Sequence, residues 1–182
     1  APSIVRMKTS ALLFPAIHPL DTSQAIEKSM AALNPASVEL TLPAGTLHAS
    51  IKQEGFLLDV HQRVVSEPPQ AVFARLASLG GAAGWLFANR LWRLRGWIDH
   101  LLGGPGLRGR QPGLQVGAVV DYYRVDALQP GKLLRLRAEL KAPGLGWMEW
   151  RLFPEGNATR LVQIAWFAPC GLPGFLYWYL LT

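Results

Sequence analysis

The chain has 182 residues, of which half are apolar and 16% are charged. This length suits one domain with a substantial core and a short appendage, and the apolar content argues against a disordered chain. The formal net charge of +6 brings nucleic acid, acidic ligands and anionic membranes into consideration as partners.

Neither end of the chain carries a clear targeting signal. The N-terminus lacks a charged segment followed by an apolar one, so we expect no signal peptide. The apolar tract 171–181 is too short to cross a bilayer. Because it runs to the chain end, we expect a C-terminal helix that is cut short, in a fragment of a longer protein. The single cysteine, Cys170, excludes an intrachain disulfide and a cysteine-based zinc site and suits a cytoplasmic location.

The N-terminal part predicts a short amphipathic helix followed by a connector. Asp21 and Gln24 have the spacing of a capping box, and an apolar stripe follows through residues 23–33. This helix cannot bury its own apolar face, so it needs a host outside the chain. From 36 to 53 the pattern fades, which favours a connector and a domain boundary near residue 50.

The next segments predict a strand and two helices. Residues 56–65 alternate and are rich in β-branched side chains, which is typical of a strand. Pro68 and Pro69 open a helix whose buried face is Val72, Phe73, Leu76 and Leu79.

A tryptophan-rich helix is expected over residues 84–102. Its apolar residues recur at helical spacing and predict one buried face: Phe87, Leu91, Leu94, Ile98 and Leu101. Three tryptophans in so short a run favour a helix that is covered on more than one side or that roofs a cavity.

The C-terminal half predicts a sheet. After a glycine-rich basic loop at 103–113, alternating segments predict four antiparallel strands and a last helix: 116–125, 133–141, 147–153, 160–167 and 172–182. We therefore predict an α+β fold over residues 51–182, in which a curved antiparallel sheet carries helices on its concave side. The hollow between sheet and helices would hold a small apolar or aromatic ligand.

Alternation also predicts which side chains share a face. Leu134, Leu136, Ala138 and Leu140 face the core, and the intervening Arg135 and Arg137 face water. Tyr122 and Tyr123 fall on opposite faces of their strand, so that one of them lines the interior.

The candidate ligand-binding residues are aromatic, amide and basic. Trp92 and Trp150 would wall the site, Tyr123 would offer a hydroxyl, and Gln163 would orient a ligand on the face that also carries Phe167. The alternatives are tryptophans that only fill the core and an amide satisfied within the protein.

Arg108 and Arg110 would clamp a carboxylate or phosphate at the cavity mouth. The alternative for both is a solvated basic loop. Nucleic acid is a disfavoured partner because the aromatic residues share the spacing of core leucines.

The sequence carries no catalytic signature. Asp99 and His100 are adjacent on a helix and predict a surface pair. His61 lies beside Asp59, but the spacing of the His, Asp and Glu residues does not indicate a metal site. We expect no catalytic residue, no metal and no cofactor.

Several segments resemble one bacterial domain family. They are Gly-Trp-x-Phe-Ala-Asn-x-Leu-Trp-x-Leu-Arg-Gly at 84–96, Gly-Gly-x-Gly-Leu-Arg at 103–108, and the runs 123–139 and 171–179. The resemblance is to the C-terminal domain fused to NmrA-like short-chain dehydrogenase/reductase domains, in the helix-grip superfamily of START-like, Bet v 1-like (SRPBCC) proteins. It covers about residues 55–182, and residues 8–40 resemble the tail of the preceding dehydrogenase-like domain. No glycine-rich nucleotide fingerprint follows a strand, so the cofactor-binding half is absent.

The resemblance implies a ligand-holding fold and assigns no catalytic residue. The first hypothesis is a non-catalytic module that binds a small hydrophobic ligand, attached to a dehydrogenase-like domain. The alternatives are a substrate pocket or lid of an NAD(P)-dependent oxidoreductase, and a structural interaction domain. Association with a membrane surface through residues 172–181 and the basic loop is a weaker alternative.

Overall fold

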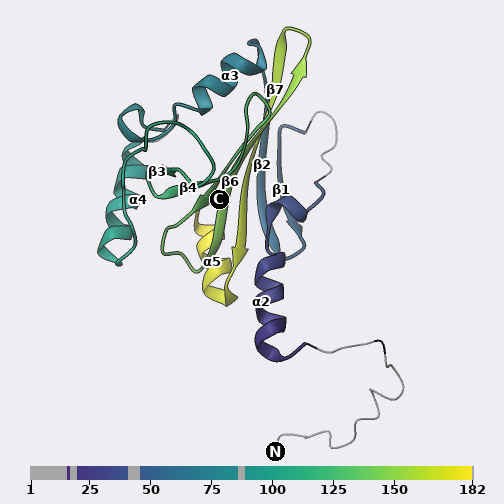
Figure 1. The fold of residues 1–182 in the computed structure, drawn as a ribbon, viewed down its shortest axis with the longest axis vertical. Helices are drawn as coiled ribbons and strands as arrows, with labels where there is room; N and C mark the ends of the chain where they lie inside the picture. Colours follow the sequence, from purple (N-terminus) through teal and green to yellow (C-terminus); the bar gives the residue numbers. More distant parts are fainter. Residues whose placement is uncertain (1–15, 17–19, 41–45, 86–88, 182) are drawn as a thin grey trace, which may run out of the picture. The chain divides into compact units, whose positions relative to one another are not determined.

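The computed structural model describes residue 16 and residues 20–40, 46–85 and 89–181 (Figure 1). The chain divides into two compact units, Ala1–Ser37 and Val38–Thr182. In the first unit, α2 (Thr22–Ala32) is followed by the 3-10 helix η1 (Pro35–Ser37).

α2 begins with the capping box that the sequence predicts. The amide of Gln24 donates to Asp21 Oδ1 at 2.8 Å, and the amide of Asp21 donates to Gln24 Oε1 at 3.3 Å. Two main-chain donors that the first helical turn leaves without a partner are satisfied in this way.

The second unit is built on one curved antiparallel sheet (Figure 1). Within the described residues it has seven strands in the order β1-β2-β7-β6-β5-β4-β3. Their bounds are β1 His48–Gln53, β2 Phe56–Val65, β3 Val119–Val120, β4 Tyr123–Gln129, β5 Leu133–Ala138, β6 Gly144–Glu155 and β7 Ala158–Pro169. The predicted α+β class with a curved antiparallel sheet is confirmed.

The helices of this unit are α3 (Pro69–Leu76), α4 (Asn89–Leu101) and α5 (Gly171–Leu181), with the 3-10 helix η2 (Gly81–Ala83). α3 packs on β6 and β7, and α5 packs on β7. Arg95 of α4 donates from Nη2 to the Tyr177 hydroxyl of α5 at 2.7 Å. Among the described residues, none of these helices has the length and apolar character needed to cross a membrane.

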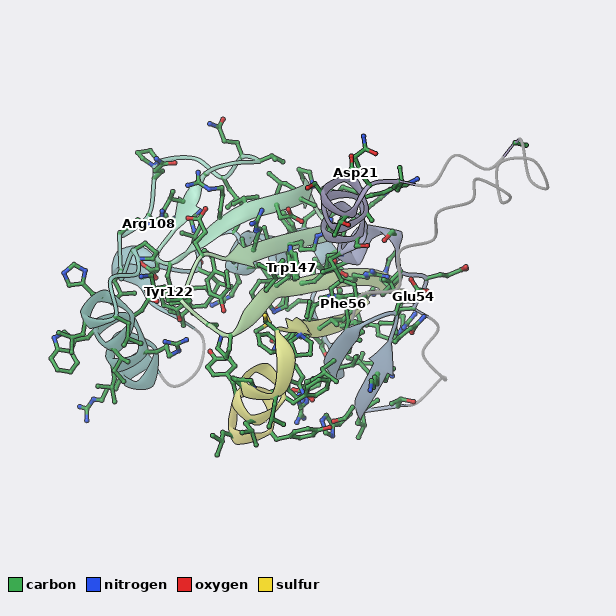
Figure 2. The ribbon with its side chains drawn as sticks, turned by 90° about the horizontal axis from the view of Figure 1, so that it is seen from below. Asp21, Glu54, Phe56, Arg108, Tyr122 and Trp147 are labelled. Atoms are coloured by element: carbon green, nitrogen blue, oxygen red, sulfur yellow. The ribbon has the colours of Figure 1, made fainter. Side chains whose placement is uncertain are left out.

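Both faces of the sheet bury apolar side chains. One face contributes Leu134, Leu136, Trp150 and Leu152 to a core that also contains Val72 and Leu76 of α3. The opposite face carries an aromatic group in which Phe56 lies 5.9 Å from Trp147 and 5.5 Å from Trp166, between ring centroids (Figure 2). Strands buried on both faces explain the high apolar content of the chain.

Strand β1 was not predicted. Its residues fall in the segment 36–53, whose pattern predicts a connector, yet they pair with β2 from His48↔His61 to Gln53↔Phe56. The side chains of β1 alternate between exposed and half-buried. Pairing with an apolar neighbour, rather than the residues' own propensity, makes this segment a strand.

The predicted strand 116–125 is interrupted. Asp121 has φ 54°, and the chain turns there between β3 and β4. Its carboxylate accepts hydrogen bonds from the Gly81 amide at 3.2 Å and from Trp85 Nε1 at 3.0 Å. Tyr122 and Tyr123 therefore pack together, with ring centroids 4.9 Å apart, and the prediction that they lie on opposite faces is wrong.

The predicted buried face of the tryptophan-rich helix is also wrong where the structure describes it. Leu94, Ile98 and Leu101 are exposed, whereas Phe87 and the side chain of Leu91 lie outside what the structure describes. Among the described side chains of α4, that of Asp99 is fully buried, and its carboxylate accepts from the amides of Gly106 at 2.9 Å and Lys141 at 2.7 Å. Asp99 and His100 are thus not a surface pair.

The predicted solvent face of β5 needs one correction. Arg137 is exposed, but Arg135 is only 6% exposed. Its guanidinium donates to Asp126 at 2.7 Å and to Glu149 at 3.1 Å, and Glu149 is itself fully buried. A buried charge is tolerated when it is paired and hydrogen-bonded in this way.

Candidate functional site

An apolar groove lies where α3 meets the ends of β2 and β7. It has a volume of about 220 Å³ and is lined by Val65, Glu67, Ala71, Val72, Arg75, Leu76 and Leu161. Its walls are aliphatic, and its charged side chains are one carboxylate and one guanidinium. The groove therefore combines apolar walls with one group of each charge, Glu67 and Arg75.

The local sequence explains how the groove is formed. Pro69 occupies the first position of α3, where a proline costs no hydrogen bond. The helix then turns Val72 and Leu76 inward. Thr159 of β7 is fully buried and donates from Oγ1 to the Glu67 carbonyl at 2.7 Å, which fixes the connection between β2 and α3.

The predicted ligand-binding residues occupy separate places. Trp150 and Tyr123 belong to the core cluster that contains α3, whereas Phe167 packs with Leu57 and Trp178 beneath α5. The side chain of Trp92 lies outside what the structure describes. Of the predicted residues that are described, none lines the groove.

Gln163 and Trp150 are brought together. They are opposite each other on β7 and β6, and Trp150 Nε1 donates to Gln163 Oε1 at 3.1 Å. The same register places His61 of β2 on the other side of Gln163. A polar row therefore runs along this sheet face from Trp150 to the edge strand.

The two arginines of the basic loop bind protein acceptors. Arg110 donates to the carbonyl of Leu79 at 2.6 Å and to the carbonyl of Ala77. Two main-chain acceptors just beyond α3 thus have hydrogen-bond donors. Arg108 donates to the Asp121 carbonyl at 3.2 Å and to the Glu139 carboxylate (Figure 2 labels Arg108). Their role as an anion clamp stays a prediction.

Burial and charge change the pKa values of three groups near this loop. Burial raises the pKa of the Tyr122 and Tyr123 phenols well above the ordinary value, so both stay protonated and neutral. Burial also opposes ionisation of Glu139, but hydrogen bonds from Arg124 and Arg108 outweigh it and hold the pKa of that carboxyl below its ordinary value. Glu139 is therefore a fixed negative charge at neutral pH.

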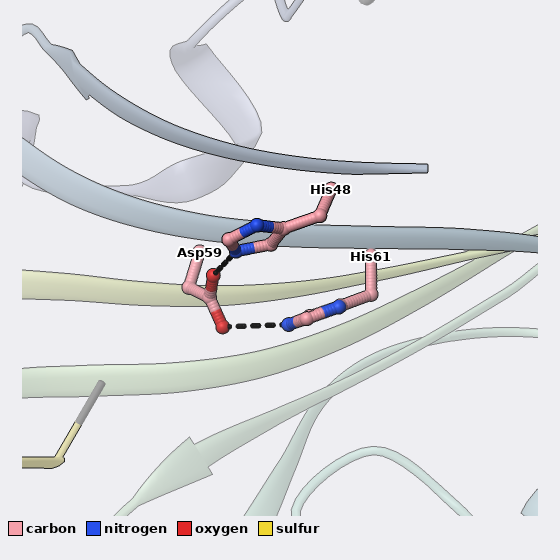
Figure 3. Close-up of side chains that lie close together, drawn as sticks. All are labelled: His48, Asp59 and His61. Atoms are coloured by element: carbon pink, nitrogen blue, oxygen red, sulfur yellow. Dashed lines mark hydrogen bonds and ion pairs between the residues drawn. The ribbon is translucent and has the colours of Figure 1, made fainter. Parts of the chain in front are cut away.

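A second cluster of polar side chains lies on the β1–β2 hairpin (Figure 3). Asp59 Oδ1 is 2.7 Å from His48 Nε2, and Asp59 Oδ2 is 3.0 Å from His61 Nε2. The two imidazole rings stack with centroids 4.5 Å apart and planes at 25°. These three side chains have the atoms to hold a metal ion.

Sequence reasoning missed this cluster and the groove for different reasons. Asp59 and His61 are two apart and share a face of any strand, but His48 joins them only through the pairing of β1 with β2. For the groove, Val72 and Leu76 were predicted as a buried helix face. The opposing residues Val65 and Leu161 are identified only once β2 and β7 are paired.

Comparison with known proteins gives a family and several fold-level similarities. A family model described as "Protein of unknown function (DUF2867)" matches residues 53–182. No curated protein matches the chain.

The similar solved structures have low sequence identity to this chain and TM-scores below 0.5. CalU16 from Micromonospora echinospora is 11% identical with a TM-score of 0.41, over 62% of this chain and 60% of that protein. The CV1439 protein from Chromobacterium violaceum is 17% identical with a TM-score of 0.39, over 66% and 86%. The Zhui aromatase/cyclase from Streptomyces sp. R1128 is 21% identical with a TM-score of 0.37, over 63% and 68%. The match thus spans about 60% of the length of CalU16.

Proposed function

This chain belongs to DUF2867, a family of proteins of unknown function, and we propose that it is a non-catalytic module that binds a small hydrophobic ligand. The observation that carries the proposal is the aliphatic groove between α3 and the ends of β2 and β7. Burial of apolar surface between such walls and an apolar ligand favours binding by about 25 cal/mol per Å² of buried surface.

The volume of the groove sets the size of the ligand. At about 220 Å³ it falls below the ~300–1,000 Å³ of pockets that enclose drug-sized molecules. It therefore accepts one aromatic ring or a short acyl chain. Arg75 at the end of α3 offers its guanidinium to a carboxylate on such a ligand, since guanidinium matches carboxylate geometry.

Filling the groove tests the proposal. Ala71 and Ala74 are both exposed on α3, but only Ala71 lines the groove. We expect Ala71→Trp to abolish binding of short-chain fatty acids and monocyclic aromatic acids, and Ala74→Trp to leave it unchanged. Displacement of 1-anilinonaphthalene-8-sulfonate and native mass spectrometry provide the measurement. Equal binding by both variants, or no binding by the unaltered protein, would contradict the proposal.

We further propose that the parent protein carries a dehydrogenase-like domain that precedes this one. The support is the resemblance of residues 8–40 to the tail of such a domain, together with the separation of Ala1–Ser37 as a compact unit. In that setting the domain over residues 51–182 would serve as the substrate pocket or the lid of an NAD(P)-dependent oxidoreductase. Deletion of residues 51–182 from the full-length parent should then lower turnover with NAD(P); unchanged turnover would exclude the lid role and leave ligand binding intact.

A second candidate function is assembly. Large apolar side chains are exposed on α4 and α5, which Arg95 and Tyr177 join. The exposed set is Leu94, Trp97, Ile98 and Leu101 in α4, and Leu172, Leu176, Tyr179 and Leu180 in α5. Apolar surface of this kind marks interaction sites.

A further inference from the structure

The β1–β2 hairpin brings three potential metal ligands to one face of the sheet. His48 and His61 are directly opposite each other, and Asp59 precedes His61 by two residues, which places it on the same face. The Gln62 amide donates to the Leu47 carbonyl at 2.9 Å, so the neighbouring pair is the hydrogen-bonded one. His48 and His61 therefore form a non-hydrogen-bonded pair, in which cross-strand side chains approach most closely.

The distances are compatible with one ion shared by the three side chains. All three ligand atoms lie within 4.8 Å of one another. Two atoms bound to a zinc ion at ~2.1 Å each can be at most about 4.2 Å apart. The two contacts with Asp59, at 2.7 and 3.0 Å, already satisfy this limit. The two histidine side chains are each about half exposed, so small rotations would bring their Nε2 atoms within the same limit of each other.

The ligand set selects the class of metal. Two imidazoles and one carboxylate suit zinc and its first-row neighbours, whereas magnesium and calcium prefer oxygen ligands throughout. Three protein ligands leave at least one position of a tetrahedral ion open to water or to an anion. Binding requires the lone pair of each Nε2, so the proton of each neutral imidazole moves to Nδ1, which is the other tautomer.

We propose that His48, Asp59 and His61 form a binding site for one Zn²⁺ ion on the β1–β2 hairpin. One ion replaces the two hydrogen bonds that the Asp59 carboxylate makes with the imidazoles (Figure 3). The site is separate from the groove beneath α3, because none of its three residues lines that groove. Loss of one function therefore leaves the other measurable.

Zinc titration of the full chain tests the site. We place all variants in a Cys170→Ser background, because Cys170 is exposed and a cysteine thiolate is itself a zinc ligand. Calorimetry should show one Zn²⁺ per chain. His48→Ala, His61→Ala and Asp59→Asn should each weaken binding by at least about tenfold, which corresponds to 1.4 kcal/mol. The matched control is His100→Ala, an exposed histidine on α4, which should leave the affinity unchanged.

A second measurement separates metal ligation from a change in folding. Cobalt(II) bound at low coordination number absorbs visible light, and this absorption should disappear in the three site variants and persist in His100→Ala. Thermal unfolding without metal should be the same in all four, since the imidazoles are exposed. Absence of saturable uptake up to about 1 mM, or unchanged affinity in His48→Ala and His61→Ala, would overturn the proposal.

Discussion

Glu149 is a fully buried carboxylate held by two arginines, from β5 and β6. It accepts from Arg135 Nη1 at 3.1 Å and from Arg151 Nε at 2.6 Å, and Arg135 is tied in turn to Asp126. Glu149 and Arg135 are both buried and compensate each other's charge, while the partly exposed Arg151 and Asp126 each add a further ion pair. Removal of one partner leaves a buried charge without compensation, which costs more than the pair contributes.

At the residue scale we therefore predict that Glu149→Gln lowers the free energy of unfolding by about 3–5 kcal/mol. Arg135 keeps its pair with Asp126, but the amide carries no charge to offset the second arginine, and its N–H group would point at guanidinium groups, which accept no hydrogen bond. Urea denaturation followed by circular dichroism measures the change. The control is Glu155→Gln, which breaks an exposed pair with Arg160 and should cost about 0–1 kcal/mol. Similar losses in both variants would refute the prediction.

At the scale of elements, α4 and α5 depart from the usual amphipathic arrangement. α4 buries Asp99 and Gly96, and α5 is apolar around most of its circumference but buries chiefly Trp178 and Gly174. The close approach of the loop after α4 explains part of this. A Cβ at Gly96 would lie 2.6 Å from the Leu107 side chain, which is too close, so this position of the helix has no room for a larger residue. Leu94 and Leu101 of the same helix are exposed.

If this apolar surface joins two copies of the chain, mutation of α5 should disperse them. We predict a concentration-dependent dimer for the unaltered protein and a monomer for Leu176→Glu combined with Leu180→Glu, because a charge cannot be buried unpaired at an interface. Size-exclusion chromatography with light scattering provides the measurement. Val64→Glu, at an exposed position of β2, is the control and should not change the mass. A monomer at all concentrations would exclude assembly through this surface.

At the scale of the whole molecule, the sequence predicted the elements with clear periodicity. The strand at 56–65 has the predicted bounds, and those around 147–153 and 160–167 are longer in the structure because hairpin pairing extends them. β1 could not be predicted, because its six residues become a strand only beside β2.

Orientation was harder to predict than periodicity. The leucine spacing of α4 is helical as expected, but the side of the helix that faces inward carries Asp99, whose carboxylate accepts from the amides of Gly106 and Lys141. For the candidate site, too, the sequence pattern did not predict which neighbours each side chain would meet. Trp150 and Gln163 meet as neighbours on one face, whereas Phe167 falls in a different cluster because α5 covers that end of β7.

The ladder between β1 and β2 also has a direction. A tight turn at Glu54 and Gly55 closes one end, and the pair His48↔His61 stands at the other. A hairpin frays first where no turn holds its strands together. His48, Asp59 and His61 therefore lie at the end of the edge strand that no turn closes. A cation bound to these three side chains would tie β1 to β2 at that open end, and the outermost strand would then separate less readily from the rest of the sheet.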